Sequence, residues 1–234
     1  MLKSLLDILF PPVCPLCEER LSADTPGFCR PCTSGFELER IKGPVCGVCG
    51  SPFRSTTGED HPCGACLIER RPFKKALSAF MYNGTVLEAV HEFKYNDRVT
   101  LAPPLARLLI ELAGSLKARP DIVIPVPLHK KRLKMRGFNQ SLLISRLIAR
   151  ALHARLDYST LKKTVETAPQ VGLDRDSRRE NVKGAFSVTD KTGLKGRRVL
   201  LVDDVYTTGS TIGECAKALK KTGAEVYALT LARA

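Results

Sequence analysis

Two adjacent carboxylates and the run of hydroxyl residues after them are the part of this sequence best equipped for chemistry. Asp203 and Asp204 end the apolar run VLLV, and a short turn leads from them toward a helical pattern. The turn contains Thr207, Thr208, Gly209, Ser210 and Thr211. Backbone amides and hydroxyls at the start of a helix form a cradle that a phosphate group fits well. Because carboxylates accept hydrogen bonds from sugar hydroxyls, the segment predicts a site for a ribose 5-phosphate group.

Two common nucleotide-binding motifs do not occur here. A P-loop requires the pattern G-x-x-x-x-G-K-S/T, and a dinucleotide site requires glycines before the helix and an acid about twenty residues later. A carboxylate that only caps a turn would explain Asp204, but it would not explain the pair together with the hydroxyl loop. The sugar phosphate is the interpretation that uses all of these residues.

Eight of the nine cysteines form four Cys-x-x-Cys pairs within the first 66 residues. The pairs are Cys14 and Cys17, Cys29 and Cys32, Cys46 and Cys49, and Cys63 and Cys66. Two residues between thiolates allow a tight turn to present both sulfurs to one zinc ion, and two turns complete a tetrahedral shell. The simplest assignment joins the first two pairs at one zinc and the last two at another, although an interleaved pairing fits the spacing as well. Four thiolates leave no open position, so both zinc ions are expected to be structural.

We expect the protein to be cytoplasmic. Thiols stay reduced there, so the regular cysteine spacing indicates metal binding rather than disulfides. A redox dithiol is normally a single Cys-x-x-Cys, and His61 is expected to be a loop residue because eight thiolates already fill two sites. No apolar run approaches the length of a membrane span. The N-terminal stretch of residues 1–10 is interpreted as an amphipathic helical turn rather than a signal.

The net charge of +13 is concentrated in one part of the chain. Residues 129–198 contain 18 Lys and Arg against 6 Asp and Glu, whereas residues 1–75 contain 10 against 9. A cationic surface of this density favours phosphate-rich partners, although such a stretch can also be a solvated face.

The elements that must position the acids alternate between strands and helices. Strand patterns cover residues 76–82, 121–128, 197–204 and 224–232, and helical patterns cover residues 85–95, 102–116, 141–156 and 211–223. This alternation predicts an α/β fold with a doubly wound, mainly parallel sheet, whose ligands lie beyond the carboxyl ends of the strands. Residues 157–197 are polar and are expected to leave the sheet. We expect a double zinc-ribbon module over residues 1–72 and the sheet domain over residues 73–234.

The stretch VLLVDDVYTTGST is similar to the phosphoribosyl pyrophosphate (PRPP) motif of type I phosphoribosyltransferases. With its cysteine pairs, the whole chain resembles the ComF family of competence-associated proteins. Further matches are FKY at 93–95, IPVPLHKKRLKMRGFNQS at 124–141 and APQVGLDRDSRRENVKGAF at 168–186.

The resemblance implies a role for each matching position. Asp203 and Asp204 would be the catalytic acid pair on the ribose hydroxyls, and Thr207 to Thr211 would hold the 5-phosphate. The pyrophosphate would contact the loop of Val126, Pro127, Leu128 and His129, with Lys130, Lys131 and Arg136 nearby. A basic stretch with Gln170, Arg178, Arg179 and Lys183 would fold over the site. Magnesium would accompany PRPP.

The resemblance also implies a function in which single-stranded DNA is handled during natural transformation or DNA utilisation, with DNA and competence proteins as partners. Two other functions fit the same residues. One is a phosphoribosyltransferase of nucleotide salvage whose acceptor the sequence does not identify, and the other is a regulator that senses PRPP without turnover. The sequence leaves the oligomeric state open.

Overall fold

A five-stranded parallel sheet forms the centre of the computed structural model, which describes residues 11–22, 27–55, 57–167, 174–190 and 192–234. The strand order is β1-β7-β6-β2-β3, and all four neighbouring pairs are parallel. The strands are β1 (Lys75–Met81), β2 (Ile122–Pro125), β3 (Arg155–Leu156), β6 (Arg198–Tyr206) and β7 (Glu225–Arg233). The predicted α/β fold with a mainly parallel sheet is confirmed.

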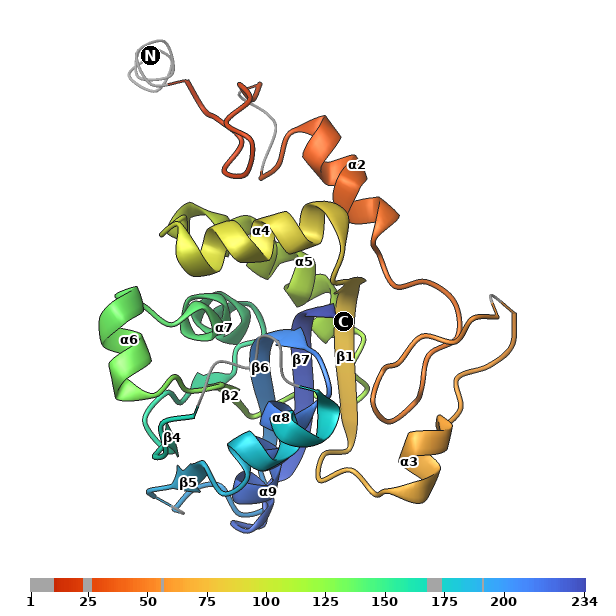
Figure 1. The fold of residues 1–234 in the computed structure, drawn as a ribbon, viewed down its shortest axis with the longest axis vertical. Helices are drawn as coiled ribbons and strands as arrows, with labels where there is room; N and C mark the ends of the chain where they lie inside the picture. Colours follow the sequence, from red (N-terminus) through yellow and green to blue (C-terminus); the bar gives the residue numbers. More distant parts are fainter. Residues whose placement is uncertain (1–10, 23–26, 56, 168–173, 191) are drawn as a thin grey trace.

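Helices cover both faces of the sheet (Figure 1). The helices α4 (Gly84–Tyr95), α5 (Ala102–Gly114) and α7 (Gln140–Ala151) share one face, and α9 (Ser210–Lys220) lies on the other. A short 3₁₀ turn, η1 (Val99–Leu101), leads into α5. Along β6, Leu200 and Val202 point into the core beneath α4, α5 and α7, whereas Val199 and Leu201 point into the core beneath α9. This is why the strand reads as a continuous apolar run.

The segment predicted to leave the sheet has regular structure of its own. It contains the antiparallel pair β4 (Leu161–Lys163) and β5 (Phe186–Val188) and the helix α8 (Arg175–Val182). Val182 and Phe186 are buried in the core beneath α9. The segment is therefore folded and packs on the sheet domain. We call its elements β4, α8 and β5 together the hood.

One local prediction was wrong, and one short helix was not predicted. The helix expected over residues 141–156 ends at Ala151, because His153 takes a left-handed conformation (φ 52°) and the chain turns into the edge strand β3. A short helix that periodicity did not reveal, α6 (Lys130–Arg136), follows β2. It buries none of its residues, so it carries no apolar stripe for a pattern to detect.

The cysteine-rich segment contains α2 (Arg30–Leu38) and α3 (Gly64–Ile68) and runs along the outer edge of β1 (Figure 1). The amide of Met81 donates to the carbonyl of Glu39 at 2.7 Å, and the amide of Ala76 donates to that of Val48 at 2.8 Å. The module thus pairs with backbone groups that an edge strand would otherwise expose.

Gln170 and the expected turn over residues 1–10 lie outside the described residues. Within the described chain, no helix is long and apolar enough to cross a membrane.

Candidate functional site

A cavity of about 780 Å³ lies at the carboxyl ends of the parallel strands, which is where the fold predicts a ligand site. Segments that are far apart in the sequence line it. They are Tyr82, Lys94, Tyr95 and Asp97; Val126, Pro127, Leu128, Arg132, Met135 and Arg136; Lys163, Arg178 and Phe186; and Asp203 to Thr207 with Gly209, Ser210, Thr211 and Ile212. A cavity of this size accommodates a small-molecule ligand.

The acid pair stands at the end of β6 on the cavity wall. Asp203 accepts a hydrogen bond from the hydroxyl of Ser141 at 3.1 Å and one from the backbone amide of Asp204 at 3.0 Å. Burial, together with the neighbouring charge of Asp204, raises the pKa of Asp203 to about 7. Asp203 therefore changes its charge near neutral pH, a behaviour typical of functional sites.

A lysine from α4 neutralises the second acid. The Nζ of Lys94 lies 2.9 Å from Oδ1 of Asp204, and both side chains are largely buried, with 18% and 15% of their surface exposed. Burial lowers the pKa of Lys94, but the carboxylate of Asp204 outweighs it and the net shift is upward. The lysine thus stays charged beside the acids.

The hydroxyl turn has the geometry of an anion cradle at the start of α9. Gly209 precedes the helix with φ 76°, a conformation that favours glycine. The hydroxyls of Thr208 and Ser210 lie 2.7 Å apart, and the amide of Ser210 donates to the Thr208 hydroxyl at 3.3 Å. Thr207, Gly209, Ser210 and Thr211 line the cavity, whereas Thr208 contacts Ser210 and does not line it.

The loop after β2 forms another part of the cavity wall. Val126, Pro127 and Leu128 line the cavity, and the carbonyl of Val126 accepts from the amide group of Asn139 at 3.0 Å. His129 and Lys130 do not line the cavity. His129 occupies the N-cap position of α6 without a side-chain capping hydrogen bond, and Lys130 is exposed at the first helical position.

Cations also line the cavity. Arg132 and Arg136 reach it from α6, and Lys163 and Arg178 reach it from the hood. Burial, together with the charge of Arg132, lowers the pKa of Lys163. Cations crowded in this way favour an anionic ligand. Lys183, which the resemblance placed over the site, instead lies 3.2 Å from Glu180 on α8 and does not line the cavity.

Sequence reasoning assigned no role to Lys94, Lys163 or Ser141. Lys94 belongs to the FKY match, and that resemblance was its signal in the sequence. Ser141 likewise ends the match over residues 124–141, whereas Lys163 joins the site through tertiary contacts alone.

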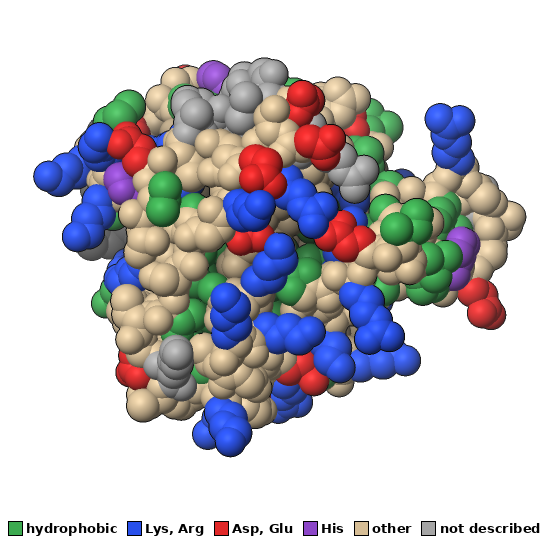
Figure 2. All heavy atoms as spheres, turned by 60° about the horizontal axis from the view of Figure 1, so that its bottom comes forward, with side chains coloured by type: hydrophobic (Ala, Val, Ile, Leu, Met, Phe, Trp, Pro, Cys, Tyr) green, Lys and Arg blue, Asp and Glu red, His purple; other side chains and the backbone are tan. Residues whose placement is uncertain are grey.

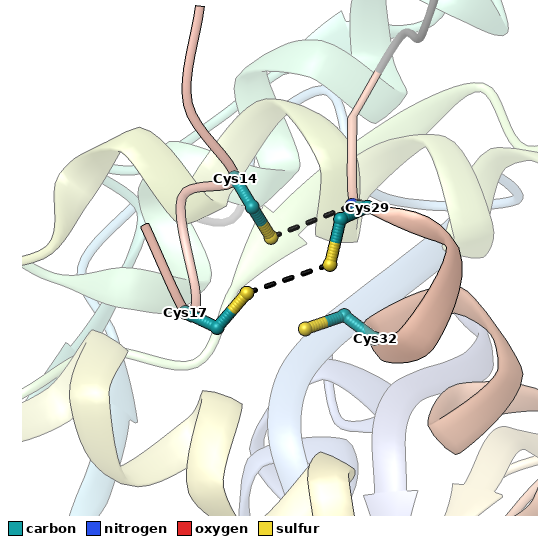
Figure 3. A group of neighbouring side chains, drawn as sticks. All are labelled: Cys14, Cys17, Cys29 and Cys32. Carbon is teal, nitrogen blue, oxygen red and sulfur yellow. Dashed lines mark hydrogen bonds between the residues drawn. The ribbon is translucent and has the colours of Figure 1, made fainter. Parts of the chain in front are cut away.

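The eight cysteines form two groups of four in chain order, Cys14, Cys17, Cys29 and Cys32, and Cys46, Cys49, Cys63 and Cys66, each with its sulfurs within 4.8 Å of one another. Figure 3 shows the sulfurs of the first group turned toward a common centre. Four sulfurs about 2.3 Å from one zinc ion lie about 3.8 Å apart. The Sγ atoms of Cys49 and Cys63 are 3.8 Å apart, and those of Cys17 and Cys29 are 3.4 Å apart. The geometry is that of the simpler, sequential pairing.

The thiols have the electrostatics of a metal site. Burial raises the pKa of Cys46, but hydrogen bonds from the backbone amides of Cys49 and Cys63 outweigh it and lower the pKa to about 6. Burial and the neighbouring sulfurs raise the pKa of Cys49 to about 12. Four thiolates in one group therefore require a cation to compensate their negative charge, and a zinc ion provides that positive charge. Both tetrads support structural zinc.

Comparison with known proteins identifies both parts of the chain. Residues 5–67 match the model of the double zinc ribbon domain, and residues 140–234 match that of the phosphoribosyl transferase domain. The fold and the site thus define a phosphoribosyltransferase-type domain that carries a double zinc ribbon.

Relatives with this architecture extend over nearly the whole chain. It is 35% identical over 221 residues to the DNA utilization protein YhgH of Escherichia coli O6:H1, a match that covers 92% of this chain and 93% of the relative. It is 34% identical over 228 residues to Competence protein F of Haemophilus influenzae, covering 94% and 96%, and 26% identical over 250 residues to Competence protein ComFC of Bacillus subtilis, covering 94% and 95%. The chain belongs to the ComF family.

Proposed function

We propose that this protein binds PRPP with magnesium in the cavity and handles single-stranded DNA on the adjoining basic surface. The first part is supported by one observation: a single cavity contains carboxylates, a glycine-containing hydroxyl turn and arginines. The carboxylates of Asp203 and Asp204 suit ribose hydroxyls, the turn at Gly209 suits the 5-phosphate, and Arg132 and Arg136 suit the pyrophosphate. We assign residues 1–72 to the zinc-ribbon module and residues 73–234 to the transferase domain, in a cytoplasmic protein.

The same layout suits phosphoribosyl transfer. When the bond between C1 and the pyrophosphate oxygen breaks, the electron pair leaves with pyrophosphate and positive charge develops on the ribose. Catalysis then depends on positioning and on cations near the leaving group. Arg132, Arg136 and Lys163 would stabilise the departing anion, and the acids would orient the sugar. Magnesium would neutralise part of the pyrophosphate charge, and carboxylate and phosphate oxygens are the ligands it prefers.

Calorimetry with PRPP and magnesium tests the proposal, with ribose 5-phosphate and pyrophosphate as partial ligands. We expect PRPP to bind more tightly than either partial ligand. Release of pyrophosphate with only one nucleobase would identify a salvage enzyme, whereas binding without turnover would support the handling or sensing role. Absence of PRPP binding by the zinc-loaded protein would refute the assignment.

The relatives' printed names, DNA utilization and competence, support the second part of the proposal together with the charge of α6. Five of its seven residues are Lys or Arg, and none of the seven is buried. Within the described residues, Lys131 is the one α6 cation that pairs with a carboxylate, Glu166. Figure 2 shows Lys and Arg also spread over the face that carries α8 and α9, but several cations there are paired, such as Arg179 with Glu69 and Lys217 with Glu214. In the described part of the chain, the other four cations of α6 have no ion pair with a carboxylate.

The two sides of α6 separate DNA binding from PRPP binding. Arg132 and Arg136 line the cavity, whereas Lys130 and Lys134 are exposed and do not line it. We expect Lys130→Gln with Lys134→Gln to weaken binding of a single-stranded oligonucleotide about tenfold and to reduce its salt slope by roughly 1.4, at about 0.7 per phosphate contact. PRPP affinity should change less than twofold.

Fluorescence anisotropy across a salt series measures this effect. The matched control is Lys220→Gln with Lys221→Gln, which removes equal charge at the end of α9 opposite the cavity. An equal loss of DNA affinity in the control would contradict a path along α6.

The raised pKa of Asp203 predicts a pH-dependent affinity. Ribose hydroxyls donate to the ionised carboxylate, so affinity for ribose 5-phosphate should rise up to about pH 7 and then level off. From pH 8 to pH 5.5 we expect affinity to fall about 30-fold more in the wild type than in Asp203→Asn, which keeps only the titration of the ligand's phosphate. Folding stability should run the other way: the folded chain holds this proton up to about pH 7, so stability declines as pH rises from about 4 to 7. Identical pH profiles for the two proteins would exclude this role for Asp203.

A further inference from the structure

An arginine connects the second zinc tetrad with the hydroxyl turn of Thr207 to Thr211. Arg233, at the end of β7, donates through Nη1 to the backbone carbonyl of Cys49 at 2.8 Å, and its Nη2 lies 3.8 Å from the Cys49 sulfur. The same guanidinium lies over the ring of Tyr206, 4.4 Å from the ring centroid. This distance is within the range of a cation–π contact.

Tyr206 in turn packs on the glycine of the turn. A Cβ atom placed on Gly209 would lie 2.2 Å from the Tyr206 hydroxyl oxygen and 2.4 Å from the ring carbon that bears it. The tyrosine is 2% exposed and is fixed at its backbone, because β6 and β7 pair Tyr206 with Arg233. Position 209 thus combines a left-handed backbone with close contact to a buried ring.

The negative charge of the zinc site stabilises Arg233 at this position. A zinc ion with four thiolates carries a net charge of −2, so cations close to the sulfurs are stabilised. Arg71 lies beside Cys66 and Arg233 beside Cys49, so two guanidiniums from distant parts of the sequence compensate the charge of the tetrad. The turn between Cys46 and Cys49 is itself bound to β1, because the amide of Ala76 donates to the carbonyl of Val48.

We propose that Arg233 is a positioning residue through which the second zinc site holds Tyr206 against Gly209 and so sets the shape of the 5-phosphate cradle. The ligand part of this inference rests on the proposed function, whereas the mechanical part does not. The zinc ribbon would then act on ligand binding through one side chain, without touching the ligand.

Arg233→Gln tests the inference in the zinc-loaded full chain. We expect its affinity for ribose 5-phosphate to fall about tenfold, while its affinity for pyrophosphate, which does not need the turn, changes less than twofold. Amide hydrogen exchange over residues 207–213 should accelerate at least threefold, and exchange over residues 126–130 should not change. Arg233→Lys keeps the charge but loses the planar stack, so it should give an intermediate result.

The matched control is Arg198→Gln. It removes a paired arginine from the opposite end of β6, where Arg198 binds Asp121 at 3.0 Å. Zinc content of two ions per chain must persist in every variant. Unchanged exchange over residues 207–213 in Arg233→Gln, or equal acceleration in Arg198→Gln, would overturn the inference. If the wild type binds neither probe, the proposed function fails while the exchange result still decides the role of Arg233.

Discussion

Replacing Asp203 and Asp204 together by asparagine is expected to raise the Kd for PRPP by about 100- to 10,000-fold, beyond detection in an ordinary titration. A hydrogen bond to a charged group contributes about 1.5–3 kcal/mol, so two of them contribute about 3–6 kcal/mol. Asparagine retains the shape and one acceptor but not the charge. Isothermal titration calorimetry at pH 8 measures the loss.

The fold should survive this double substitution. Neutralising Asp203 removes a carboxylate whose raised pKa shows that burial disfavours its charge. Neutralising Asp204 leaves the largely buried Lys94 without its partner, which is destabilising. Adding Lys94→Met to the Asp204→Asn variant removes both charges and isolates this effect.

Asp121→Asn is the matched control for the acid pair. Asp121 also pairs with a cation, Arg198, but at the amino end of the sheet. We expect unchanged PRPP affinity in this variant. If a folded Asp203→Asn, Asp204→Asn protein bound PRPP with wild-type affinity, the two acids would not be part of the PRPP site.

Loss of one zinc ligand is expected to have different consequences in the two tetrads. Cys14 and Cys29 lie in the same hydrophobic core as Phe36, Phe80 and Val86, so the first zinc site shares its packing with β1 and α4. The second tetrad forms a small cluster of its own with Phe53 and Val48. Structural zinc contributes about 10–16 kcal/mol in isolated fingers.

We therefore expect Cys14→Ser to lose one zinc ion and at least about 5 kcal/mol of stability, which lowers Tm by roughly 10–20 °C in a chain of this size. Cys46→Ser should also lose one zinc ion, lower Tm by less than half as much, and still weaken ribose 5-phosphate binding because Arg233 loses its anchor. Metal analysis and thermal unfolding measure both variants. Cys215→Ser, which alters a buried cysteine outside the tetrads, is the control. Equal Tm losses for the two ligand variants would contradict the difference in packing.

Local patterns were sufficient for much of the fold because their causes are local. The period of apolar residues predicted β1, β6 and β7 and the helices α4, α5 and α9 to within a few residues. The patterns failed where a segment lacked an apolar stripe, as in α6, or where one backbone angle ended an element, as at His153.

Residue types and spacing determined by themselves that this chain carries two thiolate tetrads, an acid pair at a strand end and a glycine-containing turn that suits phosphate. Each of these depends on neighbours within a few positions or on a short chelating repeat. Tertiary structure alone decided that Lys94 neutralises Asp204, that Ser141 bonds Asp203, and that Arg233 reaches Cys49, 184 positions away. Such contacts depend on where the strands and the module come to lie, since partners so far apart share no periodicity that the sequence could display.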